Sequence, residues 1–250
     1  MRALLLAAGL GSRLRPLTDH IPKCLVPIRG KPLLAYWLDA LCGDRLIERV
    51  LINTHHLHEA VAYFISTSHW RSQVDLVHEP ELLGTGGTIL ANRAWFGAGC
   101  FIVAHADNLT DAPLVDLIRA HEAAELGNLM TLMAFRTETP RSCGILELDA
   151  KSRVLAFHEK VTDAPGNLAN GAIYVLSPKV IARIAELGKT IVDLSTEVIP
   201  GLLPDVTALE HKGFFMDIGT PAALEKAGKT FPNLQPIVPK LPLGPPTSCL

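Results

Sequence analysis

The feature that most constrains the fold is the alternation of short apolar runs with segments of helical period. Four runs have strand length and lack regular polar alternation, as expected of strands buried on both faces. These runs are Ala3–Ala7, Arg49–Ile52, Val74–Val77 and Phe101–Ala104. Between the first two, Leu34, Trp37, Leu38 and Leu41 recur at helical spacing. This order predicts βαβ units, and therefore an α/β fold with a Rossmann-like, mostly parallel sheet flanked by helices.

After Met130 the alternation of strand-like and helical segments gives way to a different pattern. Gly144–Leu148 and Val154–Glu159 flank a polar turn, which is the pattern of an antiparallel hairpin. We expect this hairpin to form a small insertion beside a site built by the first half. Further strands are predicted at residues 172–176, 206–209 and 214–218, and helices after Pro178 and over residues 222–230.

The chain has 250 residues, enough for one large domain or two small ones. No Gly/Ser-rich linker divides it, and prolines recur from Pro232 to Pro246. Such a proline-rich stretch favours an extended tail over a packed domain. We expect a single domain over residues 1–231, a tail over residues 232–250 and no appended module.

Charge and cysteine content restrict the partners. With 23 Lys+Arg against 25 Asp+Glu, the net charge of -2 argues against a nucleic-acid partner held on a broad basic face. No apolar run approaches the roughly 20 residues of a membrane-spanning helix. The 5 cysteines are scattered and odd in number, which favours a reducing, cytoplasmic location. The sequence leaves a homo-oligomer open.

A glycine loop, Ala8-Gly9-Leu10-Gly11-Ser12-Arg13, follows the first predicted strand. It falls at the carboxyl edge of the predicted sheet, where open α/β folds bind ligands and glycine lets backbone N–H groups approach phosphate. The dinucleotide fingerprint fails because Leu14 stands at its third glycine, and the P-loop fails because Pro32 follows Gly30-Lys31. The loop alone fits a tight turn as well as a phosphate site.

Cations follow the glycine loop. Arg13, Arg15 and Lys23 lie close together in sequence, and prolines at 16, 22 and 27 restrict the backbone around them. Arginine offers a planar fork for phosphate oxygens, and lysine offers a compact point charge. The combination predicts a polyphosphate site.

The whole segment Leu6–Pro32 resembles the signature of the sugar-1-phosphate nucleotidyltransferases, the nucleoside-diphosphate-sugar pyrophosphorylases. The family pattern has a small-residue loop, G-x-R-L-x-P-L-T, P-K-x-L-x-P and K-P, and every element is present. The resemblance implies a nucleotide-diphospho-sugar transferase fold, a nucleoside triphosphate and a sugar 1-phosphate as substrates, and Arg13 and Lys23 as catalytic residues. It also implies nucleotide binding by Leu6, Ala8, Gly9, Gly11 and Ser12.

The segment Leu83–Thr88 is similar to the family loop that packs on the nucleotide base. The similarity implies that Gly84, Thr85, Gly86 and Gly87 bind the nucleotide, with bare backbone close to the base and the Thr85 hydroxyl at its edge. A plain glycine turn that caps a helix through Thr88 is the alternative.

Two aspartates follow predicted strands. Asp107 comes three residues after Phe101–Ala104, and Asp217 precedes Ile218-Gly219-Thr220-Pro221. By position alone, each aspartate could instead stabilise a turn by accepting a hydrogen bond from nearby backbone. The resemblance implies that both hold Mg²⁺ and that Asp107 also contacts the sugar phosphate. Ala106 stands where the family has glycine.

The resemblance extends to a sugar-binding region. Glu159-Lys160 matches the family's E-K-P element with Val161 in place of proline. Lys160 is implied to bind the sugar phosphate and Glu159 the sugar hydroxyls. Asn170 is implied to touch the sugar, and Gly144 to lie beneath it.

Together these matches predict nucleotidyl transfer to a sugar 1-phosphate with release of pyrophosphate. Resemblance to bacterial enzymes of GDP-mannose and GDP-heptose synthesis favours GTP, a mannose- or heptose-like sugar and a role in cell-envelope polysaccharide. A UTP-dependent enzyme for N-acetylmuramic acid 1-phosphate or another hexose 1-phosphate is the alternative. More distant rivals are a glycosyltransferase, a non-catalytic nucleotide-sugar sensor and a related-fold transferase for another phosphorylated small molecule.

Overall fold

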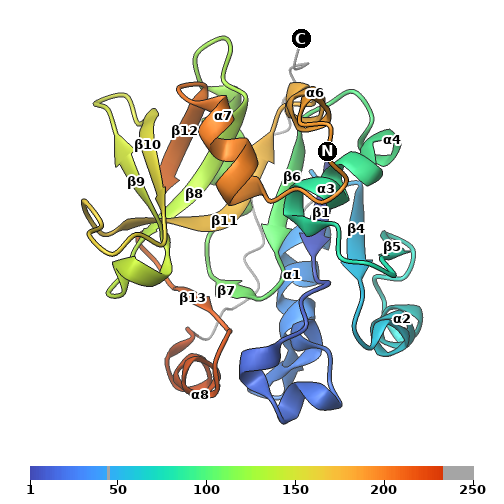
Figure 1. The fold of residues 1–250 in the computed structure, drawn as a ribbon. Coiled ribbons are helices and arrows are strands. Elements are labelled where there is room, and N and C mark those ends of the chain that lie inside the picture. Colours follow the sequence, from blue (N-terminus) through green and yellow to red (C-terminus); the bar gives the residue numbers. More distant parts are fainter. Residues whose placement is uncertain (44–45, 233–250) are drawn as a thin grey trace.

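The computed structural model describes residues 1–43 and 46–232, and a mixed sheet of 9 strands runs through this part of the chain (Figure 1). The four predicted apolar runs are confirmed as neighbouring parallel strands in the order β6-β1-β4-β5. Their bounds are β1 (Arg2–Leu6), β4 (Arg49–Thr54), β5 (Val74–His78) and β6 (Phe101–His105). Since all four run in parallel, their carboxyl ends meet at one edge of the sheet.

The second half of the chain extends this sheet. Its strands are β8 (Met130–Arg136), β9 (Gly144–Leu148), β10 (Val154–Glu159), β11 (Leu168–Leu176) and β12 (Val206–Glu210). The long strand β11 pairs antiparallel with β6 and β8. The predicted β9–β10 hairpin is antiparallel, as expected, and Ala169 of β11 pairs with Ile145 of β9. The hairpin is therefore continuous with the central sheet.

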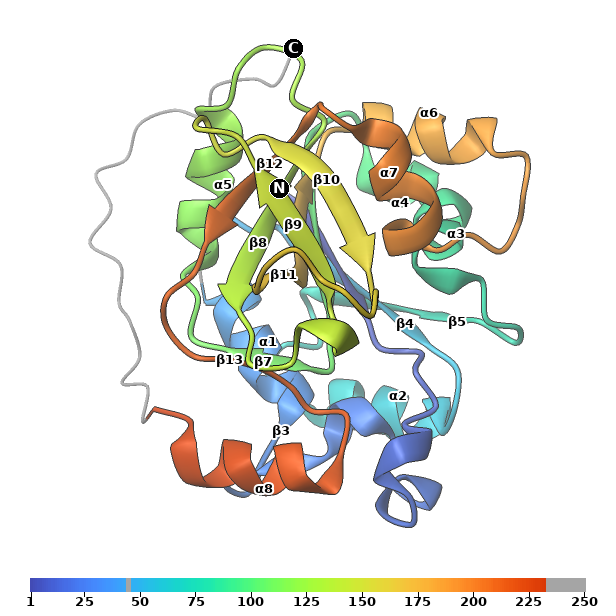
Figure 2. The same cartoon turned by 60° about the vertical axis from the view of Figure 1, so that its left-hand side comes forward.

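Helices cover both faces of the sheet, as the βαβ pattern predicts (Figure 2). Ala3 and Leu5 of β1 point to one face and Leu4 to the other, and all three are fully buried. The first face carries α1 (Leu33–Cys42), α2 (His58–Thr67) and α5 (Leu114–Glu122). The second face carries α3 (Gly84–Ala91), α4 (Arg93–Phe96), α6 (Lys179–Glu186) and α7 (Ile199–Leu202).

A third, smaller apolar cluster holds the helix α8 (Pro221–Thr230) beside the carboxyl edge. It includes Ile28, Leu109, Ile218 and Phe231. Two short ribbons adjoin it, formed by β2 (Pro27–Ile28) with β3 (Lys31–Pro32) and by β7 (Asn108–Thr110) with β13 (Phe215–Asp217). Strand β13 is shorter than predicted, and α1 begins at Leu33 because Pro32 belongs to β3.

Several short helices complete the fold. Four are 3₁₀ helices, at Ser12–Leu14, Leu17–Asp19, Lys23–Leu25 and Pro140–Ser142, and Leu194–Val198 is a π-helix. Among the described helices, none has the length and apolar character needed to cross a membrane. Of the predicted tail, residues 233–250 lie outside the described residues.

Candidate functional site

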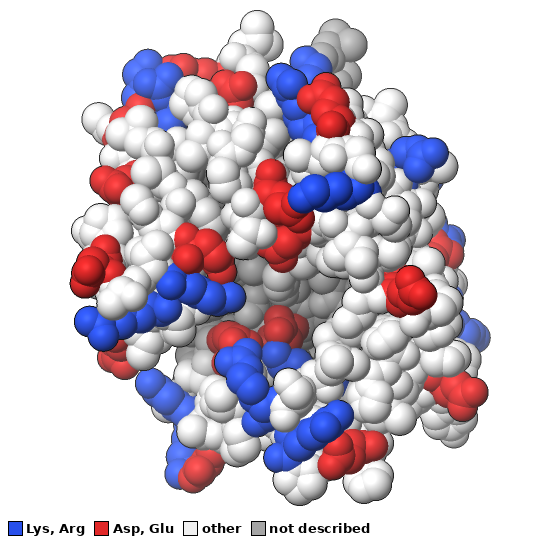
Figure 3. Space-filling view, viewed as in Figure 1, with Lys and Arg blue, Asp and Glu red and all other residues white. Residues whose placement is uncertain are grey.

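A cavity of about 210 Å³ opens at the carboxyl edge of β1, β4, β5 and β6. The space-filling view shows a hollow near the centre of one face, with acidic and basic side chains gathered at its floor (Figure 3). Seven residues predicted for the site line this cavity: Leu6, Ala8, Gly9, Lys23, Gly84, Thr85 and Asp107. The cavity therefore brings the glycine loop, the Leu83–Thr88 loop and one predicted metal ligand together.

The glycine loop is fixed by its own packing at Gly11. This residue has φ +65°, and a Cβ there would lie 2.8 Å from Cγ2 of Thr18. The buried Thr18 hydroxyl donates a hydrogen bond to the Gly11 carbonyl at 2.8 Å, and His56 Nε2 lies 3.0 Å from the Thr18 carbonyl oxygen. Gly11 thus serves the closure of the loop, whereas nothing lies within 4 Å of a Cβ added at Gly9. Gly11 and Ser12 are outside the cavity lining.

Four side chains of alternating charge form a chain at the floor of the site. Lys23 Nζ lies 2.5 Å from Asp107 Oδ2 and 3.6 Å from Asp217 Oδ1. Arg13 Nη2 lies 3.5 Å from Asp217 Oδ2. The Lys23 side chain is only 9% exposed, so these carboxylates compensate a charge that has little contact with solvent. Burial is the largest single effect and opposes ionisation of Asp107, but the charges of Lys23 and His105, together with hydrogen bonds, hold the pKa of Asp107 below its ordinary value.

The ribbon β7–β13 brings the two aspartates together. Asn108 pairs with Asp217, and the Ile218 amide donates to the Asp107 carbonyl at 2.9 Å. Ala106, the departure from the family glycine, is fully buried in the core cluster under β1 and has no positive φ. Its methyl group therefore leaves the turn that carries Asp107 unstrained.

Gly84–Gly87 form the first turn of α3 rather than a loop, and they pack against a distant segment of the chain. A Cβ at Gly84 would lie 2.5 Å from the Val192 carbonyl oxygen, and one at Gly86 would lie 2.8 Å from Val192 Cγ1. At Gly87 the carbonyl oxygen of Thr190 occupies the same place. These glycines admit the segment 190–192, and Gly86 and Gly87 are outside the cavity lining. The Thr85 hydroxyl is also engaged, since it donates to Asp193 and accepts from the Leu194 amide.

The opposite end of the cavity is a buried polar cluster. The Glu79 carboxylate accepts from Asn53 Nδ2 at 3.0 Å and from the Thr88 hydroxyl at 2.6 Å, and all three residues line the cavity. Asn53 also accepts from the Ala7 amide at 2.7 Å, which ties β4 to the glycine loop. These residues were not predicted from the sequence. The signal was present, because Asn53 and Glu79 follow strand-length apolar runs as Asp107 does.

Two further residues line the cavity beside Lys23. Burial lowers the pKa of His105, and its Nε2 atom has no hydrogen-bond partner in the described part of the chain. Burial raises the pKa of the Cys24 thiol to about 12. Since reactive cysteines require thiolate, Cys24 is unsuited to nucleophilic attack.

Three of the residues predicted to bind the sugar phosphate or the sugar lie on the β9–β10 hairpin or directly after it: Gly144, Glu159 and Lys160. A Cβ at Gly144 would lie 2.6 Å from Glu159 Oε2 and 2.5 Å from Phe157 Cζ, so glycine makes room for Glu159 there. Lys160 Nζ lies 3.0 Å from Glu159 Oε1, and Lys160 is held at φ +51°. Such conformations are costly for a non-glycine residue and often mark functional sites.

Asn170 lies on β11, where the pairing with β8 is irregular between Asn170 and Tyr174. Its amide donates to the Tyr174 hydroxyl at 2.8 Å, and its Oδ1 accepts from the Ala172 amide at 3.0 Å. Ala172 has φ +53°. Much of the Asn170 hydrogen-bonding capacity thus shapes the irregular part of β11 that contains it.

Within residues 1–43 and 46–232, no group of three or more His, Cys, Asp or Glu side chains could hold a metal ion by itself. Asp107 and Asp217 are two carboxylates that share one cation, the Lys23 ammonium. Any metal held by this pair would need further oxygen ligands, such as backbone carbonyls, substrate phosphates or water.

Known proteins resemble this chain along most of its length. It is 32% identical over 228 residues to mannose-1-phosphate guanyltransferase beta-B of Xenopus laevis, an alignment covering 88% of this chain and 62% of that protein. The chain therefore spans less than two thirds of that relative.

Solved structures share the fold. HddC of Yersinia pseudotuberculosis complexed with GMP-PN superposes with TM-score 0.75 at 27% identity, covering 92% of this chain and 99% of HddC. A Bacillus anthracis protein assigned as a glucose-1-phosphate thymidylyltransferase superposes with TM-score 0.84, covering 94% of this chain and 96% of that one. At 19% identity, the second likeness concerns the fold alone.

The family model described as nucleotidyl transferase matches residues 2–233. This range includes the cavity, the charged floor and the hairpin. The chain belongs to the nucleotidyl transferase family.

Proposed function

We propose that this protein transfers a nucleotidyl group from a nucleoside triphosphate to a sugar 1-phosphate, releasing pyrophosphate and forming a nucleoside-diphosphate sugar. The proposal rests on one observation: the four alternating charges of Arg13, Asp217, Lys23 and Asp107 are joined at one end of a cavity that Lys23 and Asp107 line. A buried lysine and an exposed arginine are suited to a polyphosphate, while the polar opposite end is suited to a base.

In this reaction an oxygen of the sugar phosphate attacks the α-phosphorus in line. The bond from the α-phosphorus to the oxygen that bridges to the β-phosphorus breaks, and pyrophosphate leaves. Lys23 and Arg13 neutralise the charge on the departing group, and the glycine loop positions the phosphates through its N–H groups. No covalent enzyme intermediate is required, consistent with the protonated thiol of Cys24.

We propose Mg²⁺ as the cofactor and Asp107 and Asp217 as its protein ligands. The pair fits a hard cation because both carboxylates already face one cationic group, the Lys23 ammonium. Magnesium binds through one or two carboxylates, with substrate phosphates and water completing its oxygen ligands. When bound, it would supply positive charge to the phosphate that reacts.

GTP is the proposed nucleotide. The relatives named mannose-1-phosphate guanyltransferases and the GMP-PN complex of HddC support this choice. The buried Glu79 carboxylate also favours bases that carry a ring N–H donor on their Watson–Crick edge. Guanine carries one at N1 and uracil and thymine at N3, whereas adenine N1 and cytosine N3 are acceptors. Glu79 therefore also supports the second candidate, a UTP-dependent enzyme.

For the sugar 1-phosphate we propose a mannose- or heptose-like substrate. Lys160 would bind its phosphate, Glu159 its hydroxyls and Asn170 the ring, with Gly144 leaving room beneath. N-acetylmuramic acid 1-phosphate is the sugar substrate of the UTP-dependent alternative.

We further propose a cytoplasmic location, a role in cell-envelope polysaccharide and a single domain over residues 1–231. The free thiols of Cys24, Cys42 and Cys143 support the cytoplasmic location.

The test is an assay of pyrophosphate release with the four ribonucleoside triphosphates and dTTP against a panel of sugar 1-phosphates, with Mg²⁺ present. We expect the highest kcat/KM for GTP with mannose 1-phosphate or a heptose 1-phosphate. Preference for UTP with N-acetylmuramic acid 1-phosphate would select the second candidate. Release of a nucleoside diphosphate would indicate a glycosyltransferase, and binding without turnover a sensor.

A further inference from the structure

Residues 190–195, here called the brace, contact Leu83–Thr88 at the start of α3, and they are linked through Tyr174 to the predicted sugar residue Asn170 on β11. We propose that the brace positions these two segments together, so that binding of the nucleotide strengthens binding of the sugar 1-phosphate and the reverse. This inference rests on the proposed function, because it takes the two segments as the two substrate subsites.

On the nucleotide side, the brace is joined to the loop by backbone. The Val192 carbonyl accepts from the amides of Gly86 and Gly87 at 2.8 and 3.1 Å, and the Val192 amide donates to the Leu83 carbonyl at 3.0 Å. The Cβ positions of Gly84, Gly86 and Gly87 are filled by the brace, as described above. The first turn of α3 therefore cannot shift without moving the brace.

Thr85 adds the side-chain link. Its hydroxyl accepts from the Leu194 amide at 2.7 Å and lies 3.4 Å from Asp193 Oδ2. A valine at this position keeps the shape and loses both contacts, whereas a serine keeps the hydroxyl. Thr85 is therefore a positioning residue. Comparing valine with serine at this position separates the effect of the hydroxyl group from the effect of side-chain size.

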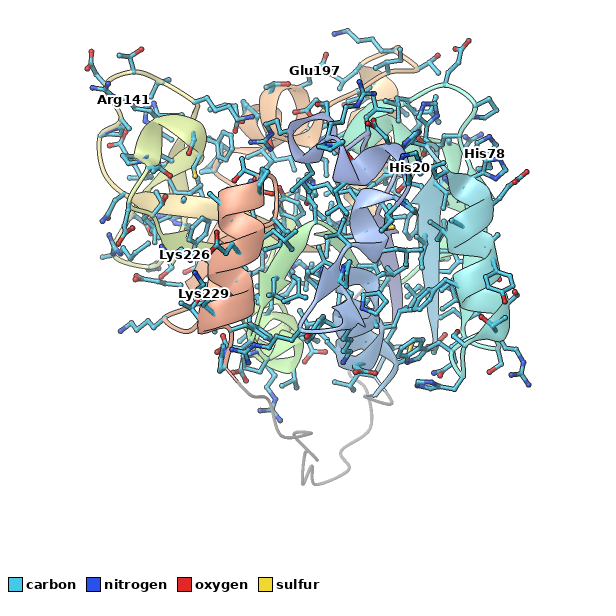
Figure 4. All side chains as sticks on the ribbon, turned by 90° about the horizontal axis from the view of Figure 1, so that it is seen from below. His20, His78, Arg141, Glu197, Lys226 and Lys229 are labelled. Atoms are coloured by element: carbon cyan, nitrogen blue, oxygen red, sulfur yellow. The ribbon has the colours of Figure 1, made fainter. Side chains whose placement is uncertain are left out.

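The brace itself is rigidly held. Val192 and Leu194 are fully buried in the core cluster that also contains Tyr174. Asp193 caps the π-helix by accepting from the Thr196 amide at 2.9 Å, and its own amide donates to Glu197 Oε2 at 3.2 Å. Figure 4 shows Glu197 on the same side of the molecule as His20 of the loop that carries Arg13 and Lys23.

On the sugar side, the link runs through a buried tyrosine. Tyr174 is fully buried, and its hydroxyl is hydrogen-bonded to Asn170 and to the Ser195 side chain. Burial raises the pKa of Tyr174, so the hydroxyl stays protonated and keeps both partners. Asn170 in turn shapes the turn with the strained Ala172. The orientation of Asn170 thus depends on the end of the brace.

Coupling follows from this sharing. A substrate that fixes one of the two segments also fixes the brace, and the other segment then loses less freedom when its own substrate binds. By linkage, the factor by which the nucleotide tightens sugar-phosphate binding equals the factor in the other direction. The π-helix at Leu194–Val198 is of a kind found frequently at functional sites.

The experiment is calorimetric titration of the full-length protein with mannose 1-phosphate and Mg²⁺, with and without the non-reacting analogue guanosine 5′-(α,β-methylene)triphosphate. Wild-type protein is expected to bind the sugar phosphate at least about fivefold more tightly when the analogue is present. In Thr85→Val and Tyr174→Phe this ratio is expected to fall toward one. Thr85→Ser is expected to retain the wild-type ratio.

Thr88→Val is the matched control, since Thr88 lies in the same helix and contacts Glu79 and the Gly84 carbonyl. It is expected to weaken nucleotide binding while leaving the ratio unchanged. If both ligands bind the wild-type protein with a ratio of one, or if Thr85→Val keeps the wild-type ratio, the coupling role is wrong. If neither ligand binds and no other triphosphate or sugar phosphate does, the proposed function fails and the inference falls with it.

Discussion

The buried Lys23 and the partly exposed Asp107 form an ion pair in which the ammonium nitrogen lies 2.5 Å from a carboxylate oxygen. The pair joins two segments that are 84 residues apart in sequence. One comes from the loop after β1 and the other from the turn after β6, and these strands are neighbours in the sheet. The parallel topology is therefore what assembles the charged floor of the site.

Removal of the Asp107 charge should stop turnover while leaving the fold intact. We expect Asp107→Asn and Arg13→Ala each to lower kcat by on the order of 10³, since charge placed at the reacting phosphates is the main source of catalysis. Asp205→Asn, at an exposed turn, is the matched control and should keep wild-type kcat. Near-normal activity of either site variant in the pyrophosphate assay would refute the assigned roles.

Replacement of Lys23 should change the titration of Asp107. A carboxyl whose pKa is lowered on folding stabilises the protein above its ordinary pKa, here 3.8, and this contribution is lost as the pH falls through the folded value. Lys23→Met removes the main attraction, so the pKa of Asp107 should rise and this stabilisation at pH 7 should disappear. Carbon-13 NMR titration of the Asp107 carboxyl measures the midpoint in both proteins; an unchanged midpoint would contradict the pairing.

Two glycines of the same loop should respond differently to alanine. Gly11→Ala meets Thr18 and a positive φ, so the free energy of unfolding should fall by about 1–2 kcal/mol. Gly9→Ala meets nothing within 4 Å but adds a methyl group to the cavity lining. It should leave stability unchanged and raise the KM for the nucleotide. Urea unfolding and steady-state kinetics of both variants decide this, and a stable Gly11→Ala would be inconsistent with the described loop.

Gly219 should matter for catalysis more than for stability. A Cβ there would lie 2.6 Å from Arg13 Nη2 and 2.9 Å from Asp217 Oδ2. Since the Arg13 side chain is 65% exposed, it can move away at little cost in stability. Gly219→Ala should therefore lower kcat by about 10- to 100-fold through misplacement of Arg13 and Asp217, with an unchanged melting temperature. A large loss of stability with normal kcat in the remaining folded protein would count against this explanation.

The Glu79 carboxylate provides a test of base selection. Glu79→Gln replaces one acceptor oxygen by a donor NH₂ while keeping the size of the side chain. We expect the preference for GTP over ATP, expressed as a ratio of kcat/KM values, to fall by at least about tenfold. An unaltered ratio would mean that Glu79 only holds Asn53 and Thr88 in place.

The sequence predicted the parallel strands and the covering helices because continuous apolar runs and helical periods depend on local pattern. It also predicted residues that the fold gathers at one sheet edge, such as Lys23 and Asp107. It did not predict the environment of Gly84, Gly86 and Gly87, because the segment that fills their Cβ positions lies more than a hundred residues later in the chain. The contacts of Thr85 with Asp193 and Leu194 could not be predicted for the same reason, since these partners are distant in sequence.

The central claim is that the α-phosphorus of the nucleotide is the atom attacked. Incubation with mannose 1-phosphate, Mg²⁺ and GTP carrying radioactive phosphorus at either the α or the γ position tests it most directly. The account predicts α-label in a guanosine-diphosphate sugar and γ-label in pyrophosphate, in equal amounts. The appearance of γ-label in inorganic phosphate, or of α-label in free GDP, would contradict it.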